Sequence, residues 1–308
     1  MEHIISIDQI NKEKLAGIFD SADEMRRKDN GTYLDRKNLA SRYIGRQMVS
    51  LFYEPSTRTR LSFELAGAKL GMGVVSTENA REFSSNAKGE TLEDTIRVLN
   101  EYHFDTLVMR HHETGAAKRA AEVATMPILN AGDGKGEHPT QAILDAYTIN
   151  EYFDGMDNLN IVIGGDLKNG RTARSLARLA ALYSGNKITF VSTPEFQMDD
   201  DVKQYLDSKN IFHKETDDMN HAVKDADVVY WTRLQKERIE GAIVQDQQFV
   251  IDRSVLDNMW QDTIIMHPLP RVGEITTDVD DDQRARYFRQ AGNGLYVRMA
   301  LLDHILEQ

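Results

Sequence analysis

The stretch RQMVSLFYEPSTRTRLSFELAGAKLG, residues 46–71, contains a predicted strand, a turn and a helix in succession. Its first eight residues, RQMVSLFY, are mostly apolar and are typical of a buried strand. Pro55 ends that strand, Ser56 is a candidate N-cap, and the helix that follows ends at Gly71, a candidate C-cap. This order of elements is the repeating unit of a parallel α/β sheet.

The alternation of strands and helices continues along the chain and falls into two series. Further strands are predicted at 73–77, 104–110, 126–132, 158–166, 187–193, 225–232 and within 257–270. Helices are predicted between them at 89–102, 114–124, 138–153, 171–183 and 199–210. We therefore expect two similar-sized α/β domains with parallel sheets and an active-site cleft between the domains. The predicted domains are 1–137, with the C-terminal helix 289–308 packed back on it, and 138–288, which includes the connecting helix 138–153.

The composition argues against several classes of protein. The 308 residues include no cysteine, which excludes a disulfide framework, a thiolate metal site and a cysteine nucleophile. The net charge of -12 argues against broad nucleic-acid binding, although a few arginines in a cleft can still attract a small anion. No apolar run approaches the ~20 residues of a membrane span, and the charged start does not resemble a signal peptide. We expect a cytoplasmic protein that needs no metal or cofactor and binds neither nucleic acid nor membrane.

The residues around Ser56 point to a site for a small phosphate. The segment from Ser56 through Thr57 and Arg58 to Thr59 would form the first helical turn, where free backbone N–H groups and the helix dipole favour an anion. The glycine-rich pattern of nucleotide P-loops is absent, which favours a compact phosphate over a triphosphate. The alternative is an ordinary capped helix with a surface arginine. Arg60 faces elsewhere on the helix and is expected to make a structural ion pair.

Other polar clusters follow the predicted strands, at the edge of a parallel sheet where ligands bind. In GEHPTQ, His138 and Gln141 share a helix face and could contact a carbonyl oxygen and an amide; the alternative is a cap histidine with a surface glutamine. Arg171 and Arg233 follow two further strands, and two arginines suit a dicarboxylate, although an arginine stripe on a helix commonly faces solvent. The prolines of MHPLPR, residues 266–271, fix backbone carbonyls that could accept from an ammonium or amide group.

Five motifs in this order closely resemble those of the catalytic chains of aspartate carbamoyltransferases, namely FYEPSTRTRLSFE, HPTQ, GDLKNGRT, TRLQKER and HPLPR. The resemblance runs nearly end to end. It implies a carbamoyl-phosphate-binding domain at 1–137 and an aspartate-binding domain at 138–288. It implies a homotrimer with active sites shared between neighbouring chains, and a separate regulatory chain is a possible partner. The implied reaction transfers the carbamoyl group of carbamoyl phosphate to the α-amino group of L-aspartate, an early step of de novo pyrimidine (UMP) biosynthesis.

The resemblance assigns roles to individual residues of this chain. For carbamoyl phosphate, the matching residues are Ser56, Thr57, Arg58, Thr59, Arg110, His138, Gln141, Leu269 and Pro270, with a candidate cis bond between the last two. The loop REFSSNAKGE, which resembles a loop lent to the neighbouring chain, contributes Lys88 and either Ser84 or the adjacent Ser85. For aspartate, the matches are Lys88, Arg171, Arg233 and Gln235. The implied catalytic residues are Arg58, Thr59, Lys88, Arg110 and His138.

Two alternative functions are compatible with parts of this pattern. Ornithine carbamoyltransferases share the phosphate motif, but they typically carry a cysteine in an HCLP segment and a distinct SMG loop. This chain reads HPLPR, has no cysteine and offers arginines rather than acids to the second substrate, which favours aspartate. The other alternative is a non-catalytic chain of a larger assembly, and the presence of every candidate arginine together with Lys88 and His138 argues against it.

Overall fold

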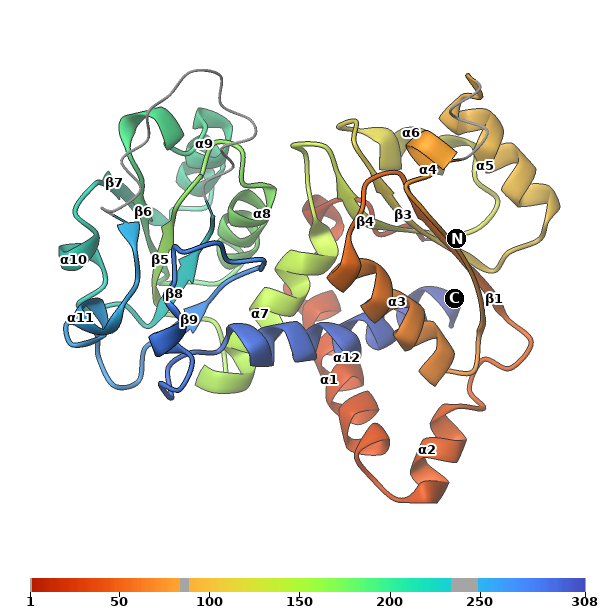
Figure 1. The fold of residues 1–308 in the computed structure, drawn as a ribbon, viewed down its shortest axis with the longest axis horizontal. Helices are drawn as coiled ribbons and strands as arrows, with labels where there is room; N and C mark the ends of the chain where they lie inside the picture. Colours follow the sequence, from red (N-terminus) through yellow and green to blue (C-terminus); the bar gives the residue numbers. More distant parts are fainter. Residues whose placement is uncertain (1, 84–88, 234–248, 308) are drawn as a thin grey trace. The chain divides into compact units, whose positions relative to one another are not determined.

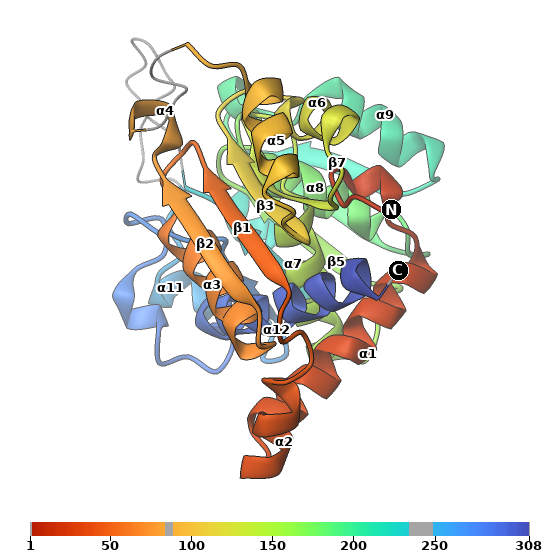
Figure 2. The same cartoon turned by 90° about the vertical axis from the view of Figure 1, so that its right-hand side faces the viewer.

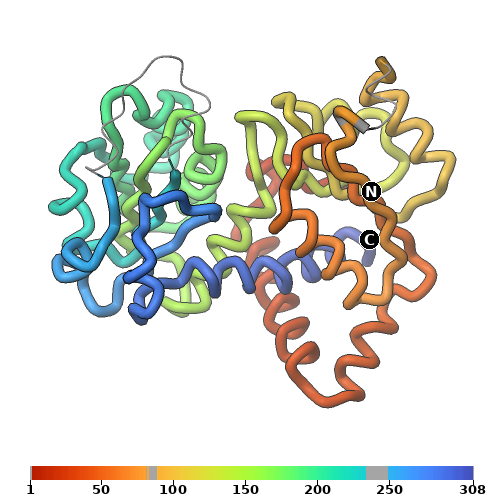
Figure 3. Tube along the Cα trace, viewed as in Figure 1, coloured from red at the N-terminus to blue at the C-terminus, as the bar shows by residue number. Residues whose placement is uncertain are grey.

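The computed structural model describes residues 2–83, 89–233 and 249–307, which form two compact units. The first unit comprises Met1–Leu144 with Gly292–Gln308, and the second comprises Asp145–Ala291 (Figure 1). Two helices, α7 (Pro139–Phe153) and α12 (Tyr287–Leu306), each begin in one unit and end in the other, so both chain crossings are helical (Figure 3). Each unit is an α/β fold with one parallel sheet, and this part of the sequence-based prediction is confirmed.

The first unit contains a four-stranded parallel sheet in the order β2-β1-β3-β4. Figure 2 shows β2, β1 and β3 in this order. The described elements of this unit are η1 (Ile7–Gln9), α1 (Lys12–Asp29), α2 (Tyr33–Leu39), β1 (Gln47–Phe52), α3 (Thr57–Lys69), β2 (Gly73–Glu78), α4 (Ala80–Phe83), α5 (Leu92–Glu101), β3 (Thr106–His111), α6 (Ala116–Val123) and β4 (Ile128–Asp133).

Helices cover both faces of this sheet because consecutive side chains of each strand point to opposite faces. Val49 of β1 belongs to a buried core with Ile96 of α5 and with the alanines of α6, so these two helices cover one face. The next residue towards the N-terminus, Met48, points the other way and lies against Gly67 of α3, where a Cβ atom would approach its Cε atom to 3.1 Å. Burial on both faces explains why the strands read as nearly continuous apolar runs.

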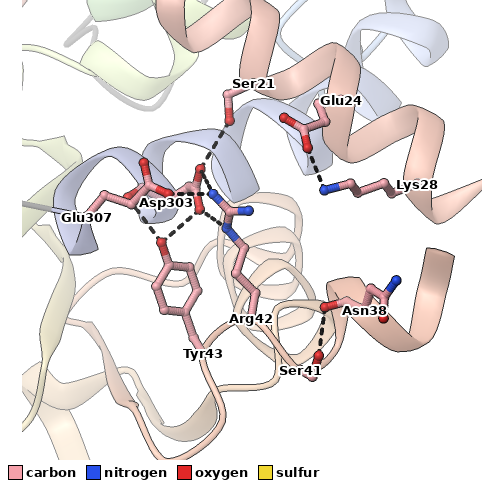
Figure 4. Close-up of polar contacts among 9 residues, drawn as sticks. All are labelled: Ser21, Glu24, Lys28, Asn38, Ser41, Arg42, Tyr43, Asp303 and Glu307. Atoms are coloured by element: carbon pink, nitrogen blue, oxygen red, sulfur yellow. Dashed lines mark hydrogen bonds and ion pairs between the residues drawn. The ribbon is translucent and has the colours of Figure 1, made fainter. Parts of the chain in front are cut away.

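The end of α12 is tied into the first unit by a cluster of polar side chains (Figure 4). Asp303 is buried and accepts hydrogen bonds from Arg42 Nη2 at 2.9 Å and from the Tyr43 hydroxyl at 2.8 Å. The Ser21 hydroxyl of α1 donates to the same carboxylate at 3.4 Å, and Arg42 also binds Glu307 at 2.6 Å. The cluster therefore joins α12 to α1 and to the turn that precedes β1.

The second unit contains a five-stranded parallel sheet in the order β7-β6-β5-β8-β9. The described elements are β5 (Asn160–Gly164), α8 (Arg171–Ala180), β6 (Lys187–Val191), η3 (Pro194–Phe196), α9 (Asp200–Ser208), β7 (Phe212–Thr216), α10 (Met219–Ala222), β8 (Val228–Trp231), α11 (Arg253–Leu256), β9 (Ile264–Met266) and η6 (Thr277–Val279). One face buries Val162, Val229 and Ile265 with residues of α10 and α11, and Trp231 there donates to the Phe249 carbonyl at 3.0 Å.

Some elements were not predicted from the sequence, and the reasons differ. The edge strand β7 carries mostly exposed or half-exposed side chains, including Phe212, and therefore lacks the apolar run of a buried strand. Helix α1 does have buried residues at helical spacing, from Leu15 through Ile18 and Ala22 to Met25, and this signal was available in the sequence. Within the described ranges, no helix combines the length and the apolar character that crossing a membrane requires.

Candidate functional site

The order of the strands marks one position in each sheet where ligands are expected to bind. In the first sheet the order of winding reverses between β1 and β3, and in the second sheet it reverses between β5 and β8. At such a switch point the loops after the two strands lead away in opposite directions, and ligands bind beyond the carboxyl ends of those strands. The segments after these four strands are therefore the candidate binding segments.

The segment after β1 enters helix α3, which begins at Thr57 with Ser56 at the N-cap position. Ser56 occupies the predicted position, but its side chain makes no capping hydrogen bond to the helix. The first-turn N–H groups of α3 are thus left without the side-chain acceptor that Thr91 provides to α5 through the Asp94 N–H at 3.1 Å. Arg58 is exposed in this turn, so the start of α3 presents backbone donors, a positive dipole end and a guanidinium together.

Arg60, one turn away from Ser56, has the structural role that the sequence predicts. Its guanidinium binds Glu64 Oε1 at 3.1 Å and Glu78 Oε2 at 3.0 Å. Glu64 in turn accepts from the Ser50 hydroxyl of β1 at 3.2 Å and from the Ser76 hydroxyl of β2. This network attaches α3 to β1 and β2. Arg58 is exposed, whereas Arg60 is held in ion pairs.

Arg110 lies at the carboxyl end of β3, directly beside the end of β1. It pairs with Phe52 in the strand register, and its carbonyl accepts from the Tyr53 N–H at 2.9 Å. The side chain is half-buried, and its Nη2 atom lies 3.4 Å from Glu54 Oε2. Arg110 therefore reaches the segment that leads to Ser56. Glu54 was not among the residues assigned a role from the sequence, although it is adjacent to the proline that ends the strand.

His138 and Gln141 lie at the start of α7, after β4, and both are buried. Their side chains are 4% and 8% exposed, which excludes the alternative of a surface glutamine. The Gln141 N–H donates to the His138 carbonyl at 3.0 Å, as expected for a residue that precedes a helix beginning at Pro139. The Thr140 hydroxyl lies 3.4 Å from His138 Nδ1.

Asp133, which sequence reasoning missed, holds the loop that carries His138. It is 6% exposed, and its Oδ2 atom accepts from the Gly115 N–H at 2.8 Å. Its Oδ1 atom accepts from the Glu137 N–H at 3.1 Å and from Asn130 Nδ2 at 3.3 Å. A carboxylate whose two oxygens receive backbone N–H groups fixes the path of the chain, so Asp133 holds the loop that leads to His138 and into α7.

His111 follows Arg110 and is buried in an aromatic contact with two neighbours. Its ring stacks on His112 with a centroid distance of 4.3 Å, and the ring of Tyr53 lies 4.4 Å away. Burial, followed by the charge of His112, lowers the pKa of His111 to about 4. Its Nδ1 atom accepts from the Glu113 N–H at 3.0 Å, so the ring is neutral at pH 7 and supports the end of β3.

Arg171 is the first residue of α8 in the second unit, at the end of the loop that follows β5. The other two arginines of its helical stripe make structural contacts. Arg174 binds Asp199 at 2.8 Å and Asp201 at 2.6 Å, and Arg178 lies over a tyrosine ring at 4.6 Å. Arg171, at the first position of α8, is the member of the stripe nearest the carboxyl end of β5, where ligands of parallel sheets are expected.

Arg233 follows β8, and the ends of β5 and β8 are joined tightly. The Thr232 N–H donates to the Gly164 carbonyl at 2.9 Å, and its hydroxyl donates to the same oxygen at 3.1 Å. Gly165 has a φ of +105°, and a Cβ atom there would lie 2.0 Å from the Thr232 carbonyl oxygen. Only glycine fits this turn, which leads towards Arg171.

Leu269 and Pro270 follow β9, and the peptide bond between them is cis, as the resemblance implies. Leu269 has a φ of 55°, and its N–H donates to His267 Nδ1 at 2.7 Å. Four residues that were assigned roles from the sequence lie outside the described residues, namely Ser84, its alternative Ser85, Lys88 and Gln235.

Comparison with known proteins identifies relatives along the whole chain. Residues 2–151 match the family described as "Aspartate/ornithine carbamoyltransferase, carbamoyl-P binding domain", and residues 157–305 match its "Asp/Orn binding domain". "Aspartate carbamoyltransferase, chloroplastic" of Oryza sativa is 50% identical, covering 98% of this chain and 84% of that protein. The same-named protein of Arabidopsis thaliana is 49% identical, covering 99% and 78%. A structure of Trypanosoma cruzi aspartate transcarbamoylase with N-(phosphonacetyl)-L-aspartic acid has a TM-score of 0.91 and 39% identity, covering 99% of this chain and 96% of the other.

These relatives correct the expected location. Both plant proteins are named as chloroplastic, and this finding overturns the cytoplasmic location that was expected from the sequence. The expectation was wrong because overall composition and charge carry little information about which compartment a chain occupies.

Proposed function

Because the chain belongs to the aspartate/ornithine carbamoyltransferase family, we propose that it transfers the carbamoyl group of carbamoyl phosphate to the α-amino group of L-aspartate. The products are N-carbamoyl-L-aspartate and phosphate, in an early step of pyrimidine (UMP) synthesis. One observation carries the proposal. Each sheet has arginine-bearing segments at its switch point, after β1 and at the end of β3 in the first unit, and after β5 and β8 in the second. Arginines suit the phosphate and the two carboxylates that the substrates present.

The phosphate is assigned to the start of α3. Ser56, Thr57 and Thr59 offer hydroxyl and backbone N–H donors there, and Arg58 can hold a phosphate through two parallel hydrogen bonds. Support comes from the missing side-chain cap on this helix and from the exposure of Arg58. Arg110, at the end of the adjacent strand, is assigned to the phosphate and to the carbonyl oxygen.

The transfer itself is assigned to donors around the carbonyl oxygen. The neutral amine of aspartate attacks the carbamoyl carbon, and negative charge develops on the oxygen as the carbon becomes tetrahedral. Thr59, Arg110 and His138 are assigned to that oxygen, where preorganised donors lower the barrier, and Gln141 is assigned to the carbamoyl amide. The bond from carbon to the phosphate oxygen then breaks, and the leaving phosphate takes the bonding electrons towards Arg58. The phosphate can also accept the amine proton, so no side-chain base is required.

The two carboxylates of aspartate are assigned to Arg171 and Arg233, assisted by Gln235 and Lys88. Support comes from the position of both arginines at the switch point of the second sheet. The Leu269 carbonyl, followed by Pro270, is assigned as an acceptor for the carbamoyl amide or the amine. Each carboxylate can receive two parallel hydrogen bonds from one guanidinium, which favours a dicarboxylic amino acid over a diamine such as ornithine.

We further propose that the active form is a homotrimer in which Lys88, with Ser84 or Ser85, completes the site of a neighbouring chain. An apolar groove of about 270 Å³ beside β2 supports a partner surface on the first unit. It is lined in part by Val75, Val98 and Tyr102, which are 51%, 42% and 66% exposed. Exposed apolar side chains gathered in one groove are typical of a surface that another chain covers.

The substrate assignment is tested with carbamoyl phosphate and a panel of amines. We expect turnover with L-aspartate and none with L-ornithine; the reverse result would reject the proposed substrate. The phosphate assignment is tested with R58A, for which we expect kcat to fall by roughly 10²-fold or more. The matched control is R97A, because Arg97 is a surface arginine of the same unit that binds only its helix neighbour Asp94 in the described contacts. Turnover of R58A at the level of R97A would contradict the phosphate site.

The shared site is tested by mixing two inactive variants. Chains carrying R58A lack one part of the site and chains carrying K88A lack another. If the sites combine Arg58 of one chain with Lys88 of the next, mixed trimers regain wild-type sites and activity returns after subunit exchange. Light scattering should give three times the 35.0 kDa chain mass. A monomeric mass, or mixtures that stay inactive although exchange is demonstrated, would reject the trimer with shared sites.

A further inference from the structure

The segment from His267 to Glu274 contains a second layer of hydrogen bonds behind the proposed substrate contact of Leu269. Leu269 has a φ of 55°, a conformation that is unfavourable for a residue with a side chain and persists only where the surroundings hold it. One such support is the imidazole ring of His267, two positions earlier. The ring Nδ1 atom accepts the Leu269 N–H at 2.7 Å.

The partners of the His267 ring define its tautomer. Since Nδ1 accepts a backbone N–H, it carries no proton, and Nε2 is then the protonated nitrogen. Nε2 lies 2.7 Å from Glu274 Oε1 and donates to it. The side chain of His267 is 1% exposed, so water cannot substitute for either partner without a rearrangement.

Glu274 forms the second anchor of the same segment. Its Oε2 atom accepts the Val272 N–H at 2.9 Å, so one carboxylate holds both the histidine ring and the backbone three residues after Leu269. Burial acts to raise the pKa of Glu274, but the hydrogen bonds from His267 and from backbone N–H groups hold that pKa below its usual value. The carboxylate is therefore ionised and keeps the Nε2 proton of His267 in place.

Behind the ring, the backbone of His267 is fixed by side chains from two helices. The His267 N–H donates to Gln290 Oε1 of α12 at 2.9 Å, and Gln290 Nε2 donates to Asp145 Oδ1 of α7 at 2.6 Å. All three residues are buried and belong to the second unit. Gln290 thus holds the backbone N–H of His267, and the His267–Glu274 pair holds the N–H groups of Leu269 and Val272.

We propose that His267, oriented by Glu274, is a positioning residue that aims the Leu269 carbonyl at the amide or amine it binds during carbamoyl transfer. The inference rests on the proposed function, because that function assigns the carbonyl its ligand. His267 touches no substrate in this role. It acts by holding the peptide plane before Leu269, so its loss affects turnover more than it affects folding of the sheet.

Two substitutions of His267 distinguish the role of its Nδ1 atom from that of its Nε2 atom. The amide of asparagine reaches the position of Nδ1 and can still accept the Leu269 N–H, whereas the amide of glutamine reaches the position of Nε2 and contacts Glu274 instead. We expect H267Q to lose roughly tenfold to hundredfold in kcat, the usual effect of displacing a positioned group by about 1 Å. H267N should stay much closer to wild type. The matched control is H213Q, which makes the same substitution at another histidine of the second unit whose Nε2 atom contacts a carboxylate, that of Asp207 at 3.0 Å.

Amide hydrogen exchange over residues 267–274 provides a readout that does not depend on turnover. The proposal expects faster exchange at Leu269 in H267Q, and slow exchange in H267N and H213Q. Equal kcat values for H267Q and H267N, or unchanged exchange in H267Q, would overturn the positioning role. Suppose that Leu269 exchanged slowly in the wild-type protein and faster in H267Q, but the wild-type protein did not carbamoylate aspartate. The proposed function would then fail, while the anchoring by His267 would stand.

Discussion

Replacing Asp133 tests whether a buried carboxylate holds the loop that carries His138. In the structure its two oxygens accept the N–H groups of Gly115 and Glu137 at 2.8 and 3.1 Å, and Asn130 adds a third donor at 3.3 Å. Alanine at this position leaves two half-buried backbone donors without their acceptor.

The expected loss of stability follows from these contacts. A buried N–H group left without a partner costs about 1–3 kcal/mol. Because these two donors are half-buried, D133A should lower the free energy of unfolding by about 2–4 kcal/mol, the lower part of the range for two groups. D133N keeps one oxygen but turns an NH₂ group towards another donor. We therefore expect D133N to lower the free energy of unfolding by about 1–3 kcal/mol. The matched control D94A removes only the exposed ion pair with Arg97, worth about 0–1 kcal/mol.

Urea unfolding gives these free energies, and kcat at saturating substrates reports the position of His138. Displacing that histidine by about 1 Å can cost on the order of 100-fold in rate, so D133N should lose activity even where it remains folded. If D133A unfolded at the same urea concentration as D94A, the assignment of Asp133 as the anchor of this loop would be refuted. If D133N were destabilised but fully active, the link from the anchor to His138 would be refuted instead.

Three further predictions concern other parts of the chain. The pKa of His111 is lowered from 6.5 to about 4 by burial and by the adjacent imidazole. As the pH falls, the unfolded chain therefore takes up a proton at this histidine at a higher pH than the folded chain does. Stability from His111 is therefore present above pH 6.5 and decreases by about 3 kcal/mol as the pH falls towards 4; urea unfolding of H111Q across this range should show a flatter dependence. R171A should raise the KM for aspartate by roughly tenfold to hundredfold, and R174A should leave it unchanged; equal values would contradict the carboxylate assignment. G165A forces a Cβ atom against the Thr232 carbonyl and should lower the unfolding free energy by about 1–3 kcal/mol or more; an unchanged thermal midpoint would contradict the tight turn.

The sequence predicted most of the buried strands because strands covered on both faces must be apolar almost throughout. β1 and β5 were predicted for this reason, and the polar segments after them were correctly predicted to lead into helices. The same reasoning could not find β7, because the side chains of this edge strand are exposed or half-exposed and need not be apolar. It also could not find the role of Asp133, since a single aspartate before a glycine is equally typical of an ordinary turn.

The two arginines of EPSTRTR, Arg58 and Arg60, differ in their partners, and only part of this difference can be predicted from the sequence. Helical spacing in the sequence already places Arg58 and Arg60 on different faces, because residues two apart never share one. Only the folded chain shows what each face meets. Arg60 is held by Glu64 of its own helix and by Glu78 at the end of β2, and the second of these partners is 18 residues away along the chain.

The sequence by itself determined the α/β class, the order of the elements and the residue types available for binding an anion, because these depend on local periodicity and on chemistry. The tertiary structure decided which strand ends become neighbours, since the order β2-β1-β3-β4 brings β1 next to β3 across more than 50 residues of chain. It also decided that His267 holds Leu269 and that Asp133 holds Glu137. Such hydrogen bonds require exact backbone directions, and these are set by packing against the rest of the sheet rather than by the identity of neighbouring residues.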